Sequence, residues 1–294
     1  MRAVAKPTND PLGVFSMCVD SIDDSDLRIR LKGISSNFVK AAIDYEQLAI
    51  NSALYTIPET PGNNSTVVLG GVTKGELKGV YTQHFVPKEK PARHIYESLL
   101  SLSKGKQCPL CGFGQVKTLD HYLPKAKFPL FSVLPANLIP ACRDCNTGKL
   151  ASTANQAKEQ PIHPYFDKAH FFSDQWLFAT VEQKAPAAVS FYVQPPQGWD
   201  QLSKDRANAH FESFALSDRF SIEVANQLAV LLHELKDLSD EAMRREHLHQ
   251  RAGCYMKVHK NSWQAALHQA LANSVWYCQD GFSAGWGGTS GGNK

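Results

Sequence analysis

Two Cys-x-x-Cys pairs are the residues of this chain whose types and spacing indicate chemistry most directly. Cys108 and Cys111 form the first pair, and Cys142 and Cys145 form the second. Each pair can place two thiolates on one tetrahedral ion, and two pairs complete the four-sulfur shell of a structural zinc site. The sequence therefore predicts a zinc ion that holds the two ends of the intervening segment together.

Polar residues between and just after the pairs suit a different reaction centre. Asp120 and His121 are adjacent, Asn137 precedes the second pair and Asn146 directly follows it. A histidine, with an unperturbed pKa of about 6.5, can take a proton from water near neutral pH. Carboxylate and amide oxygens suit Mg²⁺ or Mn²⁺ better than zinc. Activated water and a cation are the requirements for hydrolysing a phosphodiester.

The adjacency of Asp120 and His121 sets a geometric condition on such a site. Neighbouring side chains of an extended strand point to opposite faces. We therefore expect a hairpin with a distorted turn or bulge to bring both side chains to one place.

The motifs CPLC, LDHYLPK, NLIPAC and CNTGK together resemble the HNH endonucleases, also called the ββα-metal or His-Me finger family, in their zinc-stabilised form. The resemblance covers roughly residues 107–149, and Asn146 stands where many members have histidine. It implies that Asp120 and Asn146 bind Mg²⁺ or Mn²⁺, that His121 is the general base, and that Asn137 braces the loop that orients His121. Because asparagine offers a carbonyl oxygen, it can replace a neutral histidine as a ligand.

Basic residues accompany this segment. Residues 84–168 contain 12 Lys and Arg against 6 Asp and Glu, a net charge of +6, whereas the whole chain carries +3. A basic segment around a metal motif is the expected footprint of a polyanionic substrate. Lys149, one helical turn beyond Asn146, is predicted to meet a phosphate oxygen, and Lys125 and Arg143 are looser candidates for the same role.

The resemblance also implies partners. It favours DNA over RNA as the substrate, and it extends to HNH subunits of bacterial anti-phage defence systems, which often act beside an ATPase or another defence-system protein. A different hypothesis is a non-catalytic, zinc-stabilised module that binds nucleic acid or protein. A third is a nuclease that stays inactive until a partner engages its helical flanks.

Composition places the chain among ordinary globular proteins. Of its 294 residues, 43% are hydrophobic and 20% are charged. No apolar run is long enough for a signal peptide or a membrane span, so we expect a cytoplasmic protein without membrane contact. The seven cysteines do not form an even disulfide framework. Cys18, Cys254 and Cys278 are predicted to be buried free thiols.

The predicted fold is α+β and mostly helical, with an HNH core and its four-cysteine zinc site between helical flanks. We expect four regions. They are a partly helical N-terminal extension (1–85), the nuclease module (86–170), a hairpin followed by helices (171–280) and a disordered glycine-rich tail (281–294).

Hydrophobic periodicity predicts the individual elements. Helices are expected at 36–54, capped by Ser35 or Ser36, and at 91–103, with a loop at 56–79 that contains a short strand at 67–69. A β-hairpin is expected from 175–181 and 188–193. Two later helices are indicated by apolar stripes, which are Phe220, Val224, Leu228, Leu231, Leu232 and Leu235, and then Trp263, Ala266, Leu267, Ala270, Leu271 and Val275.

Two further groups have ordinary structural explanations. His163 is expected to pack on Tyr165 in a loop. His247 and His249 lie with Arg244, Arg245 and Arg251 in a basic run that is typical of a solvated helix face.

Overall fold

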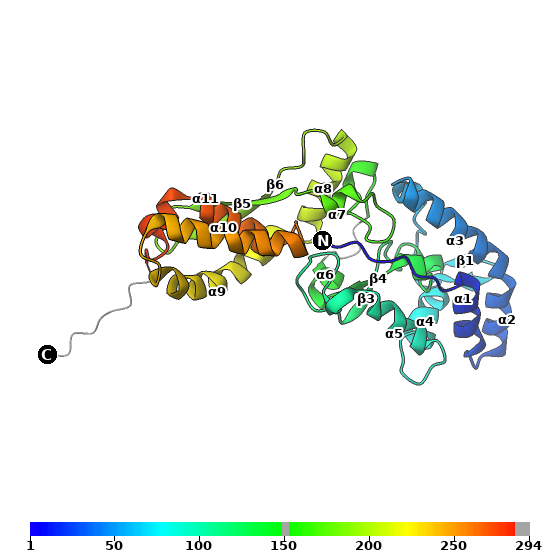
Figure 1. Cartoon of the computed structure of the whole chain (residues 1–294). Helices are drawn as coiled ribbons and strands as arrows, with labels where there is room; N and C mark the ends of the chain where they lie inside the picture. Colours follow the sequence, from blue (N-terminus) through cyan, green and yellow to red (C-terminus); the bar gives the residue numbers. More distant parts are fainter. Residues whose placement is uncertain (149–152, 286–294) are drawn as a thin grey trace. The chain divides into compact units, whose positions relative to one another are not determined.

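The computed structural model describes residues 1–148 and 153–285, and the chain divides into two compact units, unit 1 (Met1–Lys168) and unit 2 (Ala169–Lys294). The described part is α+β and mostly helical, with three two-stranded antiparallel sheets (Figure 1). The predicted fold class is confirmed at this level. Within the described ranges, no helix is both long enough and apolar enough to cross a membrane.

The predicted regions map onto these units as follows. Residues 1–85 and nearly all of 86–170 lie together in unit 1, and 171–280 lie in unit 2. Of the predicted disordered tail, residues 286–294 lie outside the described residues.

Unit 1 contains ten helices and strands within its described residues, together with short 3-10 turns. In chain order they are α1 (Pro11–Asp20), α2 (Ser25–Gly33), α3 (Ser35–Ile50), β1 (Val67–Leu69), β2 (Val72–Thr73), α4 (Lys74–His84), α5 (Arg93–Ser101), β3 (Thr118–His121), β4 (Leu138–Ala141) and α6 (Arg143–Gly148).

The first two helices were not predicted, because their apolar residues show no clear helical period. Their starts are instead set by aspartate caps. Asp10 accepts from the backbone of α1, which has Pro11 in its first turn, and Asp24 accepts from the backbone of α2. A cap of this kind satisfies backbone donors that a helix start leaves without partners.

Helix α3 confirms the predicted helix but not its cap. The inward face carries Phe38, Ala42, Tyr45 and Ala49, all buried. The predicted serine cap is wrong, because α3 begins after Ile34 with no side-chain cap bond. Ile34 also ends α2, so the chain passes from one helix to the next without the extended residue that a serine cap requires.

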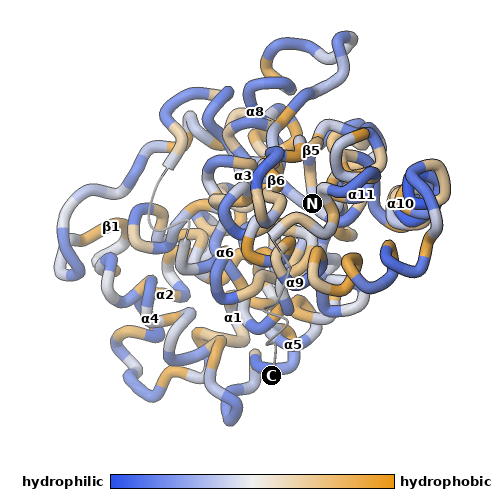
Figure 2. Tube along the Cα trace, turned by 90° about the vertical axis from the view of Figure 1, so that its left-hand side faces the viewer, coloured by the Kyte–Doolittle hydropathy of each residue, from blue (hydrophilic) through white to orange (hydrophobic). Residues whose placement is uncertain are grey.

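Helix α4 replaces the end of a predicted loop, residues 74–79. The short strand expected at 67–69 is confirmed as β1, and Figure 2 shows the segment that leads into it as hydrophilic. The loop prediction fails from Lys74 onward, because Thr73 and Glu76 form a reciprocal capping box. This box starts a helix in spite of Gly75 and Gly79.

The two-strand and helix segment at the centre of unit 1 contains the predicted reactive residues. β3 pairs with β4 in an antiparallel ladder from Thr118↔Ala141 to His121↔Leu138, and α6 follows β4 and packs against β3. Helix α5, close to the predicted 91–103, packs against both strands. Residues 122–137 form the long connection between the strands, which includes the 3-10 turns Pro129–Phe131 and Pro135–Asn137.

Unit 2 combines a hairpin with four longer helices among its described residues. Its elements are α7 (His170–Ser173), β5 (Leu177–Glu182), β6 (Ala188–Val193), α8 (Gln201–Ser213), α9 (Leu216–Lys236), α10 (Glu241–Val258), α11 (Trp263–Asn273) and a π-helical turn (Tyr277–Gly281). The predicted hairpin is confirmed by a regular antiparallel ladder.

The predicted apolar faces of unit 2 hold with one correction. All six predicted residues of α9 are buried, and α9 packs against β6 while α11 packs against β5 and α10. Val275 lies beyond the end of α11 and is 49% exposed, so the predicted stripe ends at Leu271.

The basic run on α10 is largely neutralised within unit 2. Arg245 pairs with Glu241, and both His247 and Arg251 pair with Glu234. Arg244 donates to backbone carbonyls, including those of Leu235 and Gln279. The predicted solvated face is thus found only in part, because His249 is exposed whereas the other four side chains are half-buried against these partners.

Candidate active site

The four cysteines of the predicted zinc site converge. Their sulfur atoms all lie within 4.8 Å of one another, and each side chain is buried. The backbone N–H of Gly114 donates to Cys111 Sγ at 3.3 Å, and that of Cys145 donates to Cys142 Sγ at 3.4 Å. A Cβ at Gly114 would lie 2.8 Å from Cys142 Sγ, so the close approach of the backbone requires glycine there. A four-sulfur shell of this kind could hold a structural metal ion such as zinc.

Electrostatics within the cluster also favour a cation. Hydrogen bonding from Cys108 lowers the pKa of the Cys142 thiol to about 6 and lowers the pKa of Cys111 below its usual value. Burial raises the pKa of Cys108, and contact with Cys108 raises that of Cys145. The four sulfurs therefore do not all ionise unaided, whereas a bound divalent ion would stabilise four thiolates.

His121 is the last residue of β3 and is held by a backbone carbonyl. Its Nε2 lies 2.8 Å from the carbonyl oxygen of Ser132. Because a carbonyl only accepts hydrogen bonds, Nε2 carries the proton, and the neutral ring is the tautomer whose Nδ1 has a lone pair. His121 is 6% exposed.

Helix α4 supports His121 in two ways. The Ser132 hydroxyl donates to the carbonyl oxygen of Leu77 at 2.7 Å, which ties the carbonyl partner of His121 to the helix. One turn later, the ring of Tyr81 meets the imidazole edge-on with centroids 4.5 Å apart. Neither contact was predicted, since α4 was not predicted and its first residues, 74–79, fell in the predicted loop.

Asp120 lies in the same neighbourhood although its side chain leaves the strand on the opposite face. The β3 and β4 register runs through His121 without a shift, so the predicted distortion is not within this ladder. Burial raises the pKa of Tyr81, and the Asp120 charge contributes to the rise. The same charge opposes the lowering of the Lys125 pKa by burial. Tyr81 and Lys125 therefore lie within electrostatic reach of Asp120.

Asn137 joins the two sides of the loop that follows His121. Its side chain accepts from the backbone N–H of Leu123 at 2.7 Å and donates to the carbonyls of Leu123 and Phe131 at 3.1 and 3.2 Å. Its own carbonyl accepts from the N–H of Tyr122 at 2.9 Å. Asn137 is fully buried. This one side chain therefore holds the loop closed between His121 and Ser132.

A buried relay fixes the orientation of Asn137. The backbone N–H of Tyr165 donates to Nδ1 of His163, so Nε2 of His163 carries the proton and can donate to the Tyr45 hydroxyl 3.3 Å away. Tyr45 in turn donates to Asn137 Oδ1 at 3.1 Å, and burial raises its pKa well above the usual value. His163 also packs on Tyr165 as predicted.

Asn146 lies on the face of β3 that carries Asp120. Its amide Nδ2 donates to Thr118 Oγ1 at 3.3 Å, and Thr118 and Asp120 are two residues apart on one strand, hence on one face. A Mg²⁺ or Mn²⁺ ion there would have Asp120 as its carboxylate ligand and Asn146 as its amide ligand. Among the described residues, the four cysteines are the single group of three or more His, Cys, Asp or Glu side chains arranged to hold a metal.

Comparison with known proteins finds a relative that is similar over nearly the whole chain. The chain is 32% identical to protein ea31 of Escherichia phage lambda over 290 residues, which cover 93% of this chain and 98% of the relative. The chain belongs to the ea31 family. No family model matches it, and no solved structure matches it. Because the alignment spans 93% of this chain, the similarity to protein ea31 extends over both units.

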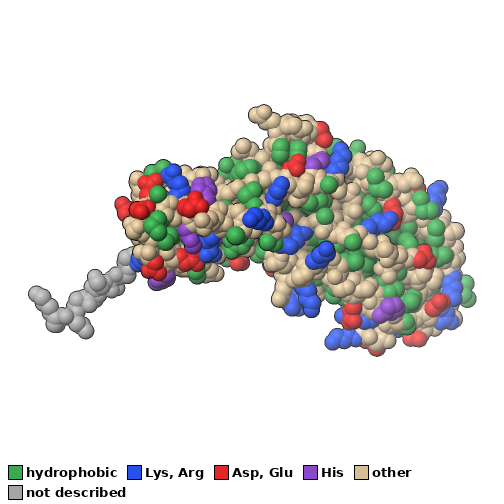
Figure 3. Space-filling model, viewed as in Figure 1, with side chains coloured by type: hydrophobic (Ala, Val, Ile, Leu, Met, Phe, Trp, Pro, Cys, Tyr) green, Lys and Arg blue, Asp and Glu red, His purple; other side chains and the backbone are tan. Residues whose placement is uncertain are grey.

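The three predicted phosphate-binding residues of this ea31-family chain, Lys125, Arg143 and Lys149, do not form one cluster among the described residues. Lys125 lies over the Tyr81 ring, with Nζ 5.2 Å from the ring centroid. Arg143 is exposed at the start of α6. Lys149 lies outside the described residues. On the face shown in Figure 3, Lys and Arg side chains are scattered among neutral and hydrophobic groups.

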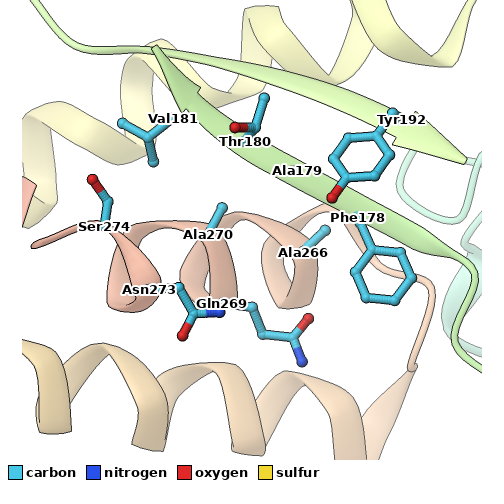
Figure 4. A pocket seen from close by; sticks show the side chains of 10 residues that line it. All are labelled: Phe178, Ala179, Thr180, Val181, Tyr192, Ala266, Gln269, Ala270, Asn273 and Ser274. Carbon is cyan, nitrogen blue, oxygen red and sulfur yellow. The ribbon is translucent and has the colours of Figure 1, made fainter. Parts of the chain in front are cut away.

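A separate groove of about 460 Å³ lies in unit 2 between β5 and α11 (Figure 4). Phe178 and Tyr192, whose rings stack 6.1 Å apart, line it together with Gln269 and Asn273. Among the described residues, no Asp, Glu, Lys, Arg, His or Cys side chain lines this groove. It therefore offers hydrogen bonds and aromatic surface, but no metal ligand or general base of the usual kinds.

Proposed function

We propose that the protein is a metal-dependent HNH endonuclease that hydrolyses phosphodiester bonds, with DNA as the favoured substrate. The observation that carries the proposal is His121, whose Nε2–H is bound to the Ser132 carbonyl and whose position follows Asp120 on a strand next to the cysteine cluster. The antiparallel pair β3 and β4 followed by α6 is the order expected of a ββα-metal core.

The proposed chemistry assigns one task to each residue. His121 accepts a proton at Nδ1 from a water molecule, whose oxygen then forms a bond to phosphorus while the bond to the 3′ oxygen breaks. Mg²⁺ or Mn²⁺ bound by Asp120 and Asn146 would supply positive charge to the phosphate and the departing oxygen. Asn137 and Ser132 hold His121 in place. The departing 3′ oxygen takes a proton from solvent water, so the products are a 5′-phosphate and a 3′-hydroxyl end.

The low exposure of the site favours a regulated form of this function. Asp120 and His121 are 7% and 6% exposed, and a long nucleic acid must reach both. The hypothesis of a nuclease that becomes active when a partner binds accounts for this burial. A defence role and an ATPase partner stay predictions from the resemblance.

The test is cleavage of supercoiled plasmid DNA with and without Mg²⁺ or Mn²⁺. We expect metal-dependent nicking by the wild type, none by His121→Ala, and wild-type nicking by His94→Ala, which removes an exposed histidine of α5. If the protein alone is inert, activity that appears on addition of a partner supports the regulated form. Inertness with DNA and RNA under all these conditions, with tight DNA binding retained, would establish the non-catalytic binding module.

A further inference from the structure

Helix α4 contributes a basic residue as well as support for His121. Lys78 stands three residues before Tyr81, so the two side chains lie on one face of the helix. The Tyr81 ring contacts His121, and Lys125 lies over the same ring. Lys78 and Lys125 are therefore both neighbours of Tyr81, and they come from two separate segments, α4 and the loop after β3.

The positive charges of these two lysines act on each other. Burial lowers the pKa of Lys125, and the positive charge of Lys78 lowers it further. Within the described residues neither lysine forms an ion pair, and Lys78 Nζ donates to the neutral amide oxygen of Asn64 at 2.9 Å. In contrast, Lys6, Lys32 and Lys127 of the same unit are each paired with a carboxylate.

Two adjacent cations repel each other, so placing them together disfavours the free protein and favours an anion-bound state. The anion must reach the site of the general base, and it must carry negative charge at two points so that each ammonium group has a partner. A nucleic-acid backbone, with its successive phosphates, meets both requirements.

We propose that Lys78 and Lys125 form a phosphate clamp that binds the backbone of the nucleic-acid strand next to the scissile bond. The clamp rests on the proposed nuclease function, whose substrate it positions. Lys78 lies outside the segment that resembles the HNH family, so the N-terminal part of unit 1 becomes a part of the substrate site. Tyr81 is the positioning residue that keeps Lys125 and His121 side by side.

The two lysines are expected to differ in their kinetic effects. Lys78 Nζ donates to the neutral side chain of Asn64, and its charge is expected to act mainly on substrate binding. Lys125 lies against Tyr81 and within reach of Asp120, so its loss is expected to lower kcat as well as raise KM.

The experiment compares Lys78→Ala, Lys78→Arg and the control Lys40→Ala, which removes an exposed lysine of α3 that forms no ion pair with another described residue. Binding of a fluorescent DNA duplex is measured in EDTA over a range of salt concentrations, and cleavage is measured separately. For Lys78→Ala we expect roughly tenfold weaker binding, a salt slope reduced by about 1, and kcat within about twofold of wild type. Lys78→Arg restores the slope, and Lys40→Ala leaves both unchanged.

The experiment distinguishes a wrong phosphate clamp from a wrong nuclease function. If the wild type cleaves DNA but Lys78→Ala binds and cleaves like Lys40→Ala, the clamp is wrong and the nuclease stands. If the wild type binds DNA through Lys78 without cleaving it, the nuclease is wrong and the phosphate site stands. If the wild type neither binds nor cleaves DNA or RNA, both are wrong.

Discussion

The imidazole of His121 and the phenol ring of Tyr81 meet edge-on, with centroids 4.5 Å apart and ring planes at 70°. Tyr81 belongs to α4, 40 residues before His121 in the sequence. The proposed general base is therefore positioned by a helix that lies outside the motif it belongs to. The contact involves the faces and edges of the rings, whereas the Tyr81 hydroxyl lies 3.5 Å from the Leu119 carbonyl, at the limit of a hydrogen bond.

Two substitutions of Tyr81 distinguish the contribution of its ring from that of its hydroxyl. Tyr81→Leu is expected to lower kcat by about tenfold or more with KM changed less, because His121 loses the surface that orients it. Tyr81→Phe keeps that surface and is expected to stay within about threefold of wild type. Steady-state cleavage kinetics of both variants provide the measurement. Equal losses in Phe and Leu variants would show that the hydroxyl acts, contrary to this account.

Acid sensitivity of α4 is expected from Glu76. Bonding to Arg30 lowers the pKa of this carboxylate to about 2, against about 4.3 in an unfolded chain. A lowered carboxylate pKa means that the folded state gains stability above the unfolded pKa and loses it as pH falls toward 2. Glu76 also accepts from the Thr73 backbone N–H at 2.7 Å.

Glu76→Gln is therefore expected to lower the free energy of unfolding by about 1–3 kcal/mol at pH 7. The gap to wild type should stay constant from about pH 5 to 8 and shrink below about pH 4. Urea unfolding at several pH values measures it. Glu97→Gln is the control, since Glu97 is largely exposed in its pair with Arg93 and is expected to cost under about 0.5 kcal/mol. A gap that persists unchanged at pH 3 would contradict the assignment to the carboxylate charge.

Metal removal addresses the cysteine cluster. Purified protein is expected to contain about one equivalent of zinc, and Cys142→Ser is expected to lose it with a large fall in Tm. Cys254 serves as the control. It is free but exposed, so the prediction of a buried thiol is wrong for Cys254, although it holds for Cys18 and Cys278. Cys254→Ser should keep both metal and Tm. Elemental analysis and thermal unfolding give the two readouts. Full stability in a metal-free Cys142→Ser protein would rule out a structural role for the metal.

The cysteine site was predictable from sequence because its information is local. Each Cys-x-x-Cys spacing brings two sulfur atoms together, and the buried cluster forms where the two pairs meet. The same holds for the β5 and β6 hairpin and for α9, where a period of two or of 3.6 residues marks the buried face.

The supports of His121 could not be predicted because they depend on tertiary packing. Ser132 and Tyr81 carry no local signal of their roles, and each is defined by its contact with a distant segment. Tyr45 lies on the buried face of α3, and helical periodicity does not indicate that its hydroxyl bonds to Asn137. The Thr73 and Glu76 capping box was a local signal for α4, but the nearby glycines favoured the prediction of a loop.

The single-turnover rate of DNA cleavage by His121→Ala tests the central claim most directly. Wild type, His121→Ala and His94→Ala are compared at saturating protein with Mg²⁺ or Mn²⁺, and zinc content and Tm are measured on the same preparations. We expect His121→Ala to lose at least about 10²-fold in rate while its zinc content and Tm match wild type, because loss of a general base removes a factor of this size. Cleavage by His121→Ala at the wild-type rate would contradict the account.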